Sequence, residues 1–383
     1  MPPRVASISD YRELARRRLP RMLFEYVDGG SYDEVTLRAN VQDLQAIRLR
    51  QRVMRDVSAT SLATHWFGRD WSLPVALGPV GFAGAFARRG ELQAARAAGA
   101  AGVPFTLSTV GICSVEEVAA ALPGAFWFQL YVIRDRGFLS GLLERVAAAR
   151  PAALVLTADL PVAGARYRDV RSGMNAPGAV GTLSRLWQAA LRPRWSWDVA
   201  LRGRPLAFAN LEGAVRDAKH VDELLPWLFR NMDPSVTWQD LDWIRERWSG
   251  PLVVKGILDP EDAAAALAAG ADAVVVSNHG GRQLDGVSSS IRALPAIVER
   301  VAGRIPVFVD GGIRSGIDVL RALALGANGC LLGRAWAYAL AADGERGVRH
   351  ALAVIREELR VAMALTGLTR VQDAGAHLLH REP

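Results

Sequence analysis

A histidine and an arginine lie three residues apart in the segment Ser-Asn-His-Gly-Gly-Arg at residues 277–282. The imidazole of His279 titrates near neutral pH, and it can act as a general base when a carboxylate orients it. Asp159, at the end of another apolar run, is the candidate for that carboxylate. The guanidinium forks of Arg282 and Arg166 suit a substrate carboxylate. Together these residues predict proton abstraction from a substrate held by its acid group, although His279 alone is equally compatible with a hydrogen-bonded turn.

One lysine stands out in a chain whose basic residues are almost all arginines. Lys219 and Lys255 are the only lysines among 46 lysines and arginines, and Lys255 follows an apolar run. This choice indicates that a compact positive charge is needed there. Schiff-base chemistry and stabilisation of an anionic cofactor ring are two uses for it. A strand-end lysine whose ammonium group reaches solvent is the alternative.

Two glycine-containing turns favour the binding of an anion. Gly311 and Gly312 follow one apolar run, and Gly333 with Arg334 follows the next. Glycine lets the backbone approach an anion closely, and N–H groups at the start of a helix point toward it. Arg334 adds charge-assisted hydrogen bonds. We expect a phosphate-bearing cofactor at these turns, with plain tight turns as the alternative.

Eight short apolar runs must carry these residues, and an amphipathic or alanine-rich segment follows each one. Their β-branched and aromatic residues are typical of parallel strands buried on both faces. The runs begin near Val75, Phe105, Phe126, Ala153, Leu252, Ala273, Val307 and Cys330. Eight such units predict an α/β fold, a (β/α)₈ TIM barrel, whose active site lies at the carboxyl ends of the strands. A doubly wound sheet is disfavoured because the chain has neither a G-x-G-x-x-G motif nor a P-loop.

The chain is predicted to form one domain over residues 1–383. The barrel is expected at about 70–340, after a helical lead-in and before a C-terminal helix at about 345–365. The fourth and fifth apolar runs are much farther apart than the others, so an insertion is expected at about 160–250.

Composition restricts the functional classes. Of the 383 residues, half are hydrophobic and 22% are charged, an ordinary globular balance. The net charge of +7 fits an anionic substrate, nucleic acid or an anionic membrane surface, but no nucleic-acid signature is recognisable. The first twenty residues lack the apolar core of a secretory signal. Cys113 and Cys330 have no metal-type spacing, so neither a metal site nor a disulfide framework is predicted.

The nonapeptide Ser-Asn-His-Gly-Gly-Arg-Gln-Leu-Asp at 277–285 is similar to the signature of the FMN-dependent α-hydroxy-acid dehydrogenase and oxidase family. Other segments resemble the family in the same order along the chain, to about residue 370. These are Arg-Arg-Leu-Pro at 17–20, Tyr-Val-Asp-Gly-Gly at 26–30, Leu-Ser-Thr at 107–109, Phe-Gln-Leu-Tyr at 128–131, Val-Lys-Gly at 254–256 and Asp-Gly-Gly-Ile-Arg at 310–314. Segments 165–169, 193–199 and 256–263 are most similar to the bacterial membrane-associated L-lactate dehydrogenases, with mandelate dehydrogenases next.

The resemblance implies FMN as the cofactor and a role for each matching residue. His279 is implied as the base, and Asp159 as the group that stabilises its protonated form. Tyr131 is implied to hydrogen-bond the substrate hydroxyl or the developing carbonyl. The carboxylate is implied to bind Tyr26, Arg166 and Arg282. Cofactor binding is implied for Ser108, Gln129 and Thr157 at the ring, Lys255 beside its N1 and C2 carbonyl, Ser277, and, around the phosphate, Asp310, Gly311, Gly312, Arg314, Gly333 and Arg334.

The implied reaction is oxidation of an L-2-hydroxy acid, here L-lactate to pyruvate, with a membrane quinone as electron acceptor. Oxidases of the family use oxygen instead, and a larger acid such as mandelate stays open because Gly81 leaves room in the pocket. Two other hypotheses are an FMN-barrel isomerase acting on a phosphorylated substrate and a non-catalytic barrel that docks on membranes.

The insertion contains a basic stretch interleaved with tryptophan. Residues 171–204 hold six arginines, a single acid and three tryptophans, Trp187, Trp195 and Trp197. Such a composition is typical of a segment in an anionic membrane interface; the alternative is an arginine-rich cover over the site, with the tryptophans in a small core of its own. We expect peripheral attachment to the cytoplasmic face of the inner membrane and, from the resemblance, a homo-oligomer, commonly a tetramer.

Overall fold

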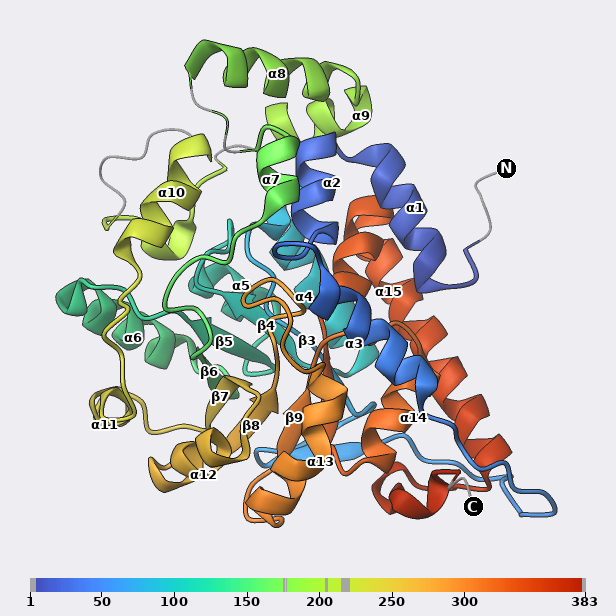
Figure 1. Cartoon of the computed structure of the whole chain (residues 1–383). Coiled ribbons are helices and arrows are strands. Elements are labelled where there is room, and N and C mark those ends of the chain that lie inside the picture. Colours follow the sequence, from blue (N-terminus) through green and yellow to red (C-terminus); the bar gives the residue numbers. More distant parts are fainter. Residues whose placement is uncertain (1–4, 175, 177, 204–205, 215–220, 381–383) are drawn as a thin grey trace.

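The computed structural model contains a closed barrel of eight parallel strands (Figure 1). It describes residues 5–174, 176, 178–203, 206–214 and 221–380. In order around the barrel the strands are β3 (Val75–Leu77), β4 (Phe105–Ser108), β5 (Phe126–Leu130), β6 (Ala153–Thr157), β7 (Leu252–Ile257), β8 (Ala273–Val276), β9 (Val307–Val309) and β10 (Gly329–Leu332), which pairs with β3. The predicted TIM barrel is confirmed, each predicted run forms one of its strands, and a doubly wound sheet is excluded.

A hairpin closes the amino-terminal end of the barrel. Its strands are β1 (Thr64–Trp66) and β2 (Arg69–Trp71). Trp66 packs edge-on against Phe308, with 5.0 Å between the ring centroids, and also contacts Trp127. These rings belong to one buried cluster with alternate residues of the strands, which face inward together. The interior is therefore filled from this end, and only the end where the strands finish is left for a site.

Helices cover the outside of the barrel. They are α4 (Gly90–Ala101), α5 (Val115–Ala121), α6 (Arg136–Ala149), α12 (Pro260–Ala268), α13 (Ser290–Val301) and α14 (Gly316–Ala324), with 3₁₀ turns at η1 (Ala83–Ala85), η4 (Val371–Asp373) and η5 (Ala376–Leu378). The last helix, α15 (Arg334–Thr366), breaks at Asp343 and Gly344, and Gly344 adopts φ +60°. The predicted helix at 345–365 is the part of α15 after this break.

The N-terminal segment packs beside the barrel mouth as three helices. These are α1 (Ile8–Arg18), α2 (Arg21–Asp28) and α3 (Val35–Ala46). Buried Asp28 ties them to the rest of the chain, since its carboxylate accepts hydrogen bonds from Arg12 at 2.6 Å, Tyr338 at 2.7 Å and Arg168 at 2.8 Å. The lead-in, the insertion and the last helix are thus joined at one carboxylate.

The chain leaves the barrel after β6 and returns at β7. In between lie α7 (Tyr167–Arg171), α8 (Gly178–Ala190), α9 (Pro193–Trp195), the π-helical turn η2 (Ser196–Leu201), the 3₁₀ turn η3 (Ala209–Leu211), α10 (Val221–Asn231) and α11 (Asp240–Arg245). Figure 1 shows α8 at the edge of the molecule, beyond α7 and α2. Arg204, the last of the six arginines predicted to meet a membrane, lies outside the described residues. None of the described helices combines the length and the apolar character needed to cross a membrane.

Candidate active site

Inward-facing residues at the strand ends form the floor of the barrel mouth. The strand register pairs Ser108 with Gln129 and Thr157 with Lys255. Ser108 Oγ donates a 2.9 Å hydrogen bond to Gln129 Oε1, while the buried amide nitrogen of Gln129 has no partner among the described residues. Lys255 Nζ donates to Ser277 Oγ at 2.9 Å. The floor therefore offers polar groups to whatever binds above it.

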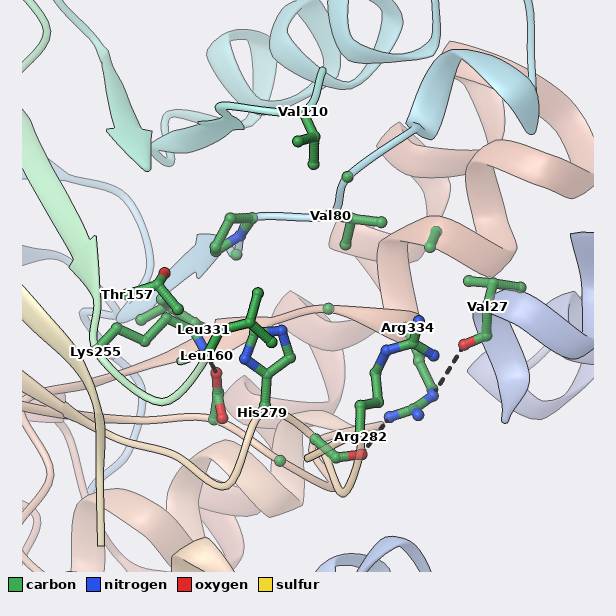
Figure 2. A pocket seen from close by; sticks show the side chains of 18 of the residues that line it. Val27, Val80, Val110, Thr157, Leu160, Lys255, His279, Arg282, Leu331 and Arg334 are labelled. Atoms are coloured by element: carbon green, nitrogen blue, oxygen red, sulfur yellow. Dashed lines mark hydrogen bonds and ion pairs between the residues drawn. The ribbon is translucent and has the colours of Figure 1, made fainter. Parts of the chain in front are cut away.

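A cavity opens above this floor. Figure 2 shows the side chains of Lys255, His279, Arg282 and Arg334 around the same space. The predicted residues that line it are Tyr26, Gly81, Tyr131, Thr157, Arg166, Lys255, His279, Arg282, Asp310, Gly311, Gly312, Arg314, Gly333 and Arg334. A concave space with convergent charged groups in an otherwise apolar barrel is the expected form of a small-molecule site.

The histidine and the carboxylate expected to act together are in contact. His279 Nδ1 lies 2.8 Å from Asp159 Oδ1, and both side chains are mostly buried. Burial lowers the pKa of His279 below its usual value, and Asp159 offsets part of this effect. Burial acts to raise the pKa of Asp159, but His279 and Lys255 lower it more, so its net pKa is below the usual range. At neutral pH the pair is therefore a neutral imidazole beside a carboxylate, the state that a general base requires.

The loop after β8 holds His279 in a constrained conformation. His279 has φ +56°, in the left-handed region that few residues other than glycine adopt. Its N–H donates to Ser277 Oγ at 3.0 Å. The loop is also held by a pair of reciprocal 2.8 Å hydrogen bonds between the side-chain amides of Asn278 and Asn40 on α3. Helix α3 thus helps to fix the loop that presents the imidazole.

Space for Asp159 depends on a glycine in the neighbouring strand. Gly256 in β7 adopts φ +109°. A Cβ added there would lie 2.6 Å from the Cβ of Asp159 and 2.9 Å from its backbone nitrogen. The Val-Lys-Gly segment therefore places Lys255 on the floor and leaves room for the carboxylate that orients His279.

Two arginines that line the cavity lie near the same aromatic ring. The guanidinium carbon of Arg282 lies 5.0 Å from the ring centroid of Tyr26, and that of Arg166 lies 6.0 Å from it. Arg282 Nη1 donates to the carbonyls of Tyr26 and Gly29, which leaves its Nε and Nη2 without a partner among the described residues. Burial, reinforced by Arg282, lowers the pKa of Arg166 to about 10. Two desolvated cations with free donors are suited to a bidentate carboxylate.

Lys255 is a buried, charged group. Its Nζ lies 3.1 Å from Asp310 Oδ2. Burial acts to lower the pKa of Lys255, but Asp310 and Asp159 raise it, and the net pKa is above the usual value. Schiff-base chemistry needs a neutral amine, so this environment disfavours it. A fixed ammonium group in the floor instead suits negative charge that develops on a ring above it.

The turns after β9 and β10 form an open cradle. Gly311 and Gly312 adopt φ +91° and φ +85°, and a Cβ added at Gly312 would lie 2.1 Å from the carbonyl oxygen of Asn40. A Cβ added at Gly333 would meet no atom within 4 Å. The backbone is therefore accessible to an anion at Gly333, while Gly312 is required by the packing of α3.

Arg334 is a buried guanidinium beside this cradle. It donates to the carbonyl oxygens of Val27, Gly280 and Gly29 at 2.7 to 3.0 Å. No described carboxylate forms an ion pair with it. Burial lowers its pKa to about 9, and the charges of Arg282 and Arg314 lower it as well. A phosphate at the cradle would supply the missing anion, although Arg334 also ties the N-terminal segment to the mouth, a role that the sequence does not indicate.

Tyr131 is the remaining polar side chain on the wall. It is buried, and its backbone N–H donates to Thr109 Oγ1 at 3.0 Å. Burial raises the pKa of its phenol, and Asp159 raises it further. The hydroxyl therefore stays protonated at neutral pH, so it can donate a hydrogen bond to a substrate oxygen.

The structure separates the predicted residues into wall, floor and support. Ser108, Gln129 and Ser277 belong to the floor but are not among the residues that line the cavity. Asp159 is also outside the lining, and it contacts His279, which lines it. Wall residues that were not predicted individually include Val27, Val80, Val110, Leu160, Leu228 and Phe229. Val110 and Leu160 lie close to strand ends, a usable signal, whereas Leu228 and Phe229 come from α10, whose sequence carries no sign of this position.

Comparisons with known proteins give consistent matches. A family model described as FMN-dependent dehydrogenase matches residues 15–381. An L-lactate dehydrogenase of Caulobacter vibrioides (strain NA1000 / CB15N) is 58% identical over 375 residues, covering 98% of this chain and 97% of the relative. An L-lactate dehydrogenase of Xanthomonas oryzae pv. oryzae (strain PXO99A) is 55% identical over 377 residues, with the same coverage.

Two solved structures match over almost the whole chain. The crystal structure of the monotopic membrane protein (S)-mandelate dehydrogenase has a TM-score of 0.91 and 37% identity, covering 99% of this chain and 100% of that one. A mandelate oxidase with (S)-4-hydroxymandelic acid has a TM-score of 0.85 and 39% identity, covering 98% of each chain.

Proposed function

Because the chain belongs to the FMN-dependent dehydrogenase family, we propose that it oxidises L-lactate to pyruvate and passes the electrons to a membrane quinone. The cofactor is FMN and the reaction class is oxidation of a 2-hydroxy acid. The isomerase and the non-catalytic barrel are set aside on the same grounds. The observation that carries the proposal is the 2.8 Å contact between His279 and Asp159, with His279, Arg166 and Arg282 lining one cavity.

The residues of the mouth fit FMN. The unpartnered amide nitrogen of Gln129 and the ammonium group of Lys255 suit the polar edge of the ring. Arg334 and the backbone at Gly333 suit the phosphate. Asp310 carries a negative charge next to Lys255, so it suits ribityl hydroxyls better than the phosphate for which it was predicted. When bound, FMN supplies the acceptor of two electrons from the substrate.

The chain's own residues hold and activate the substrate. Arg166 and Arg282, which both lie near the ring of Tyr26, bind the carboxylate and so direct the Cα hydroxyl toward His279. The neutral imidazole takes up the proton, and Asp159 stabilises the charge that then forms on the ring. Tyr131 donates a hydrogen bond to the substrate oxygen. We propose these roles for all five residues.

The identity of the acid rests on the relatives and on the wall. The similar chains from Caulobacter and Xanthomonas are L-lactate dehydrogenases, whereas the matched structures act on mandelate compounds. At Gly81, an added Cβ would lie 2.5 Å from Cγ2 of Val110, so this wall has no room for even one more carbon without movement of Val110. We place L-lactate first, and mandelate is the larger acid to test beside it.

The electron acceptor is tested by comparing quinone with oxygen. With L-lactate under nitrogen, we expect the FMN-loaded protein to reduce a short-chain ubiquinone with one pyruvate formed per quinone. In air without quinone, we expect little hydrogen peroxide. Fast peroxide formation together with no quinone reduction would contradict the dehydrogenase and favour the oxidase.

An exposed apolar face on the insertion supports peripheral membrane attachment. Val180, Leu183 and Trp187 recur on one side of α8 and are 83%, 69% and 66% exposed. Trp197 and Leu201 on η2 are exposed as well. Trp195 differs, since it is buried and its indole nitrogen donates to the carbonyl of Ala85 at 2.7 Å. One tryptophan thus anchors the segment, and the other two are free to enter an interface.

We expect the apolar face of α8 to control binding to anionic vesicles. In the double variant Leu183→Glu/Trp187→Glu, the partition coefficient into vesicles should fall by about tenfold or more for each side chain replaced. Full burial of one large apolar side chain is worth about 1.5–3 kcal/mol. Leu365→Glu, at an exposed apolar residue of α15, is the matched control. Vesicle co-sedimentation measures the effect, and equal partition of all three proteins would contradict it. The cytoplasmic face and the homo-tetramer stay predictions.

The fall in the rate of flavin reduction at acid pH should report the protonation of His279, whose pKa Asp159 influences. Flavin reduction needs neutral imidazole, and burial lowers the pKa of His279 below 6.5, so the rate should fall only as pH drops below that value. Asp159 raises this pKa, so Asp159→Asn should move the limb to still lower pH while reducing the plateau by at least about tenfold. Stopped-flow flavin bleaching against pH measures both. Asp70→Asn, in the exposed His65–Asp70 pair, should change neither; a limb that moves to higher pH in Asp159→Asn would refute the pairing.

A further inference from the structure

Helix α10 places an aromatic side chain against one of the two substrate arginines. The guanidinium carbon of Arg166 lies 5.9 Å from the ring centroid of Phe229 and 6.0 Å from that of Tyr26. Since Arg282 stacks on Tyr26 at 5.0 Å, the four side chains alternate as ring, cation, ring and cation. Such an arrangement reduces the repulsion between two guanidinium groups that share a cavity.

Arg166 has little else to hold it in place. Its nearest described carboxylate oxygen is Oδ2 of Asp169, at 3.9 Å, which is beyond hydrogen-bond distance. Its Nε is buried and has no partner among the described residues. By contrast, Arg282 is tied to two backbone carbonyls. Before the substrate binds, the orientation of Arg166 therefore depends on the rings that face it.

The end of α10 that carries Phe229 is firmly attached to the barrel. Arg134 N–H donates to the carbonyl of Asn231 at 2.9 Å, and Asp233 N–H donates to that of Val132 at 3.1 Å. Arg136 adds ion pairs to Asp233 at 2.7 Å and to Asp240 at 2.9 Å. These contacts fix the carboxyl end of the helix to the loop that follows β5. A ring mounted at this end can therefore act as a fixed support.

We propose that Phe229 is a positioning residue for the carboxylate of the substrate, through Arg166. Its ring holds the guanidinium plane toward the cavity and keeps water from the face that Tyr26 leaves uncovered. The proposal rests on the proposed function insofar as the carboxylate belongs to a 2-hydroxy acid. Phe229 belongs to the insertion, so the same segment that carries the exposed apolar face of α8 also completes the substrate site.

The pH at which kcat/KM falls on the alkaline side distinguishes this role from a general loss of packing around the site. Burial lowers the pKa of Arg166 to about 10, so kcat/KM should fall as pH approaches that value. Removal of the Phe229 ring admits water, which raises this pKa and moves the limb to higher pH. The titratable and charged groups that face Arg166 are Tyr26, Tyr131, Asp169, His279 and Arg282, and all of them are retained in the variant.

The test compares Phe229→Ala, Phe229→Leu and Phe229→Trp in the FMN-loaded protein. With Ala and Leu, KM for L-lactate and Kd for oxalate, read from the flavin spectrum, should rise by roughly tenfold, about 1.4 kcal/mol, with kcat nearly unchanged. Phe229→Trp should restore both constants because it keeps a ring. The alkaline limb should move to higher pH in the Ala variant only.

The neighbouring aromatic residue of α10 provides the control. Trp227 is partly buried and does not line the cavity, so Trp227→Leu should leave the oxalate Kd and the alkaline limb unchanged. Unchanged constants in both Phe229→Ala and Phe229→Leu, or the same losses in Trp227→Leu, would overturn the proposal. Oxalate binding does not require turnover, so a protein that binds oxalate but oxidises no 2-hydroxy acid would refute the proposed function while still testing Phe229.

Discussion

Flavin reduction by L-lactate should slow by about 10³-fold in His279→Gln, within the range that loss of a positioned general base produces. Glutamine can still donate a hydrogen bond to Asp159, so the loop should keep its conformation. It cannot accept the substrate proton, and no other described side chain that lines the cavity offers a neutral base: Lys255 and the arginines are charged, and the pKa of Tyr131 is raised. Anaerobic stopped-flow bleaching of bound FMN measures the rate.

The chain offers a matched control for this variant. His65 Nδ1 lies 2.7 Å from Asp70 Oδ1 on the exposed hairpin at the opposite end of the barrel. His65→Gln removes the same kind of histidine–carboxylate contact and should bleach at the normal rate. If His279→Gln also bleached at a near-normal rate with FMN bound, the assignment of His279 as base would be wrong.

Arg166→Met should lower kcat/KM for L-lactate by about 10²- to 10³-fold, because a buried charge that binds a carboxylate is worth about 2–5 kcal/mol. The same change should not destabilise the free protein. The guanidinium group is buried without a carboxylate within hydrogen-bond distance, and its pKa is lowered to about 10 by that burial. Its replacement by an apolar side chain removes a desolvation penalty. We therefore expect an unchanged or slightly higher melting temperature together with the loss of activity.

Arg171→Met is the matched control for this second variant. Arg171 is exposed and stacks on Tyr167 at 5.6 Å in the same insertion. In detergent solution, it should change neither kcat/KM nor the melting temperature. A large drop in melting temperature for Arg166→Met, with kcat/KM preserved, would show that Arg166 is structural and that the carboxylate binds elsewhere.

The parts of the site that follow from the barrel itself could be predicted from the sequence. Parallel strands end at the same edge, so Lys255, His279 and Asp159 had to meet there once the eight apolar runs were recognised. The chemistry of these residues could be predicted because the strand ends of a barrel have fixed positions relative to each other.

Features that depend on tertiary packing could not be read in the same way. Phe229 reaches the cavity from the carboxyl end of α10, which is joined to the loop after β5, and no periodic pattern encodes that contact. The hairpin with Trp66 was missed because its strands, Thr-His-Trp and Arg-Asp-Trp, contain no apolar run. Arg334 was assigned to phosphate alone, whereas its three carbonyl contacts make it a structural tie as well.

The most direct measurement mixes the purified, FMN-loaded protein with L-lactate without oxygen and follows the flavin absorption band. We expect rapid bleaching with one pyruvate formed per flavin, and no bleaching with D-lactate. The spectrum also reports whether the protein binds FMN at all. A protein that holds FMN but stays yellow with L-lactate, L-mandelate and longer L-2-hydroxy acids would contradict the claim that His279 and the two arginines form an oxidation site for such acids.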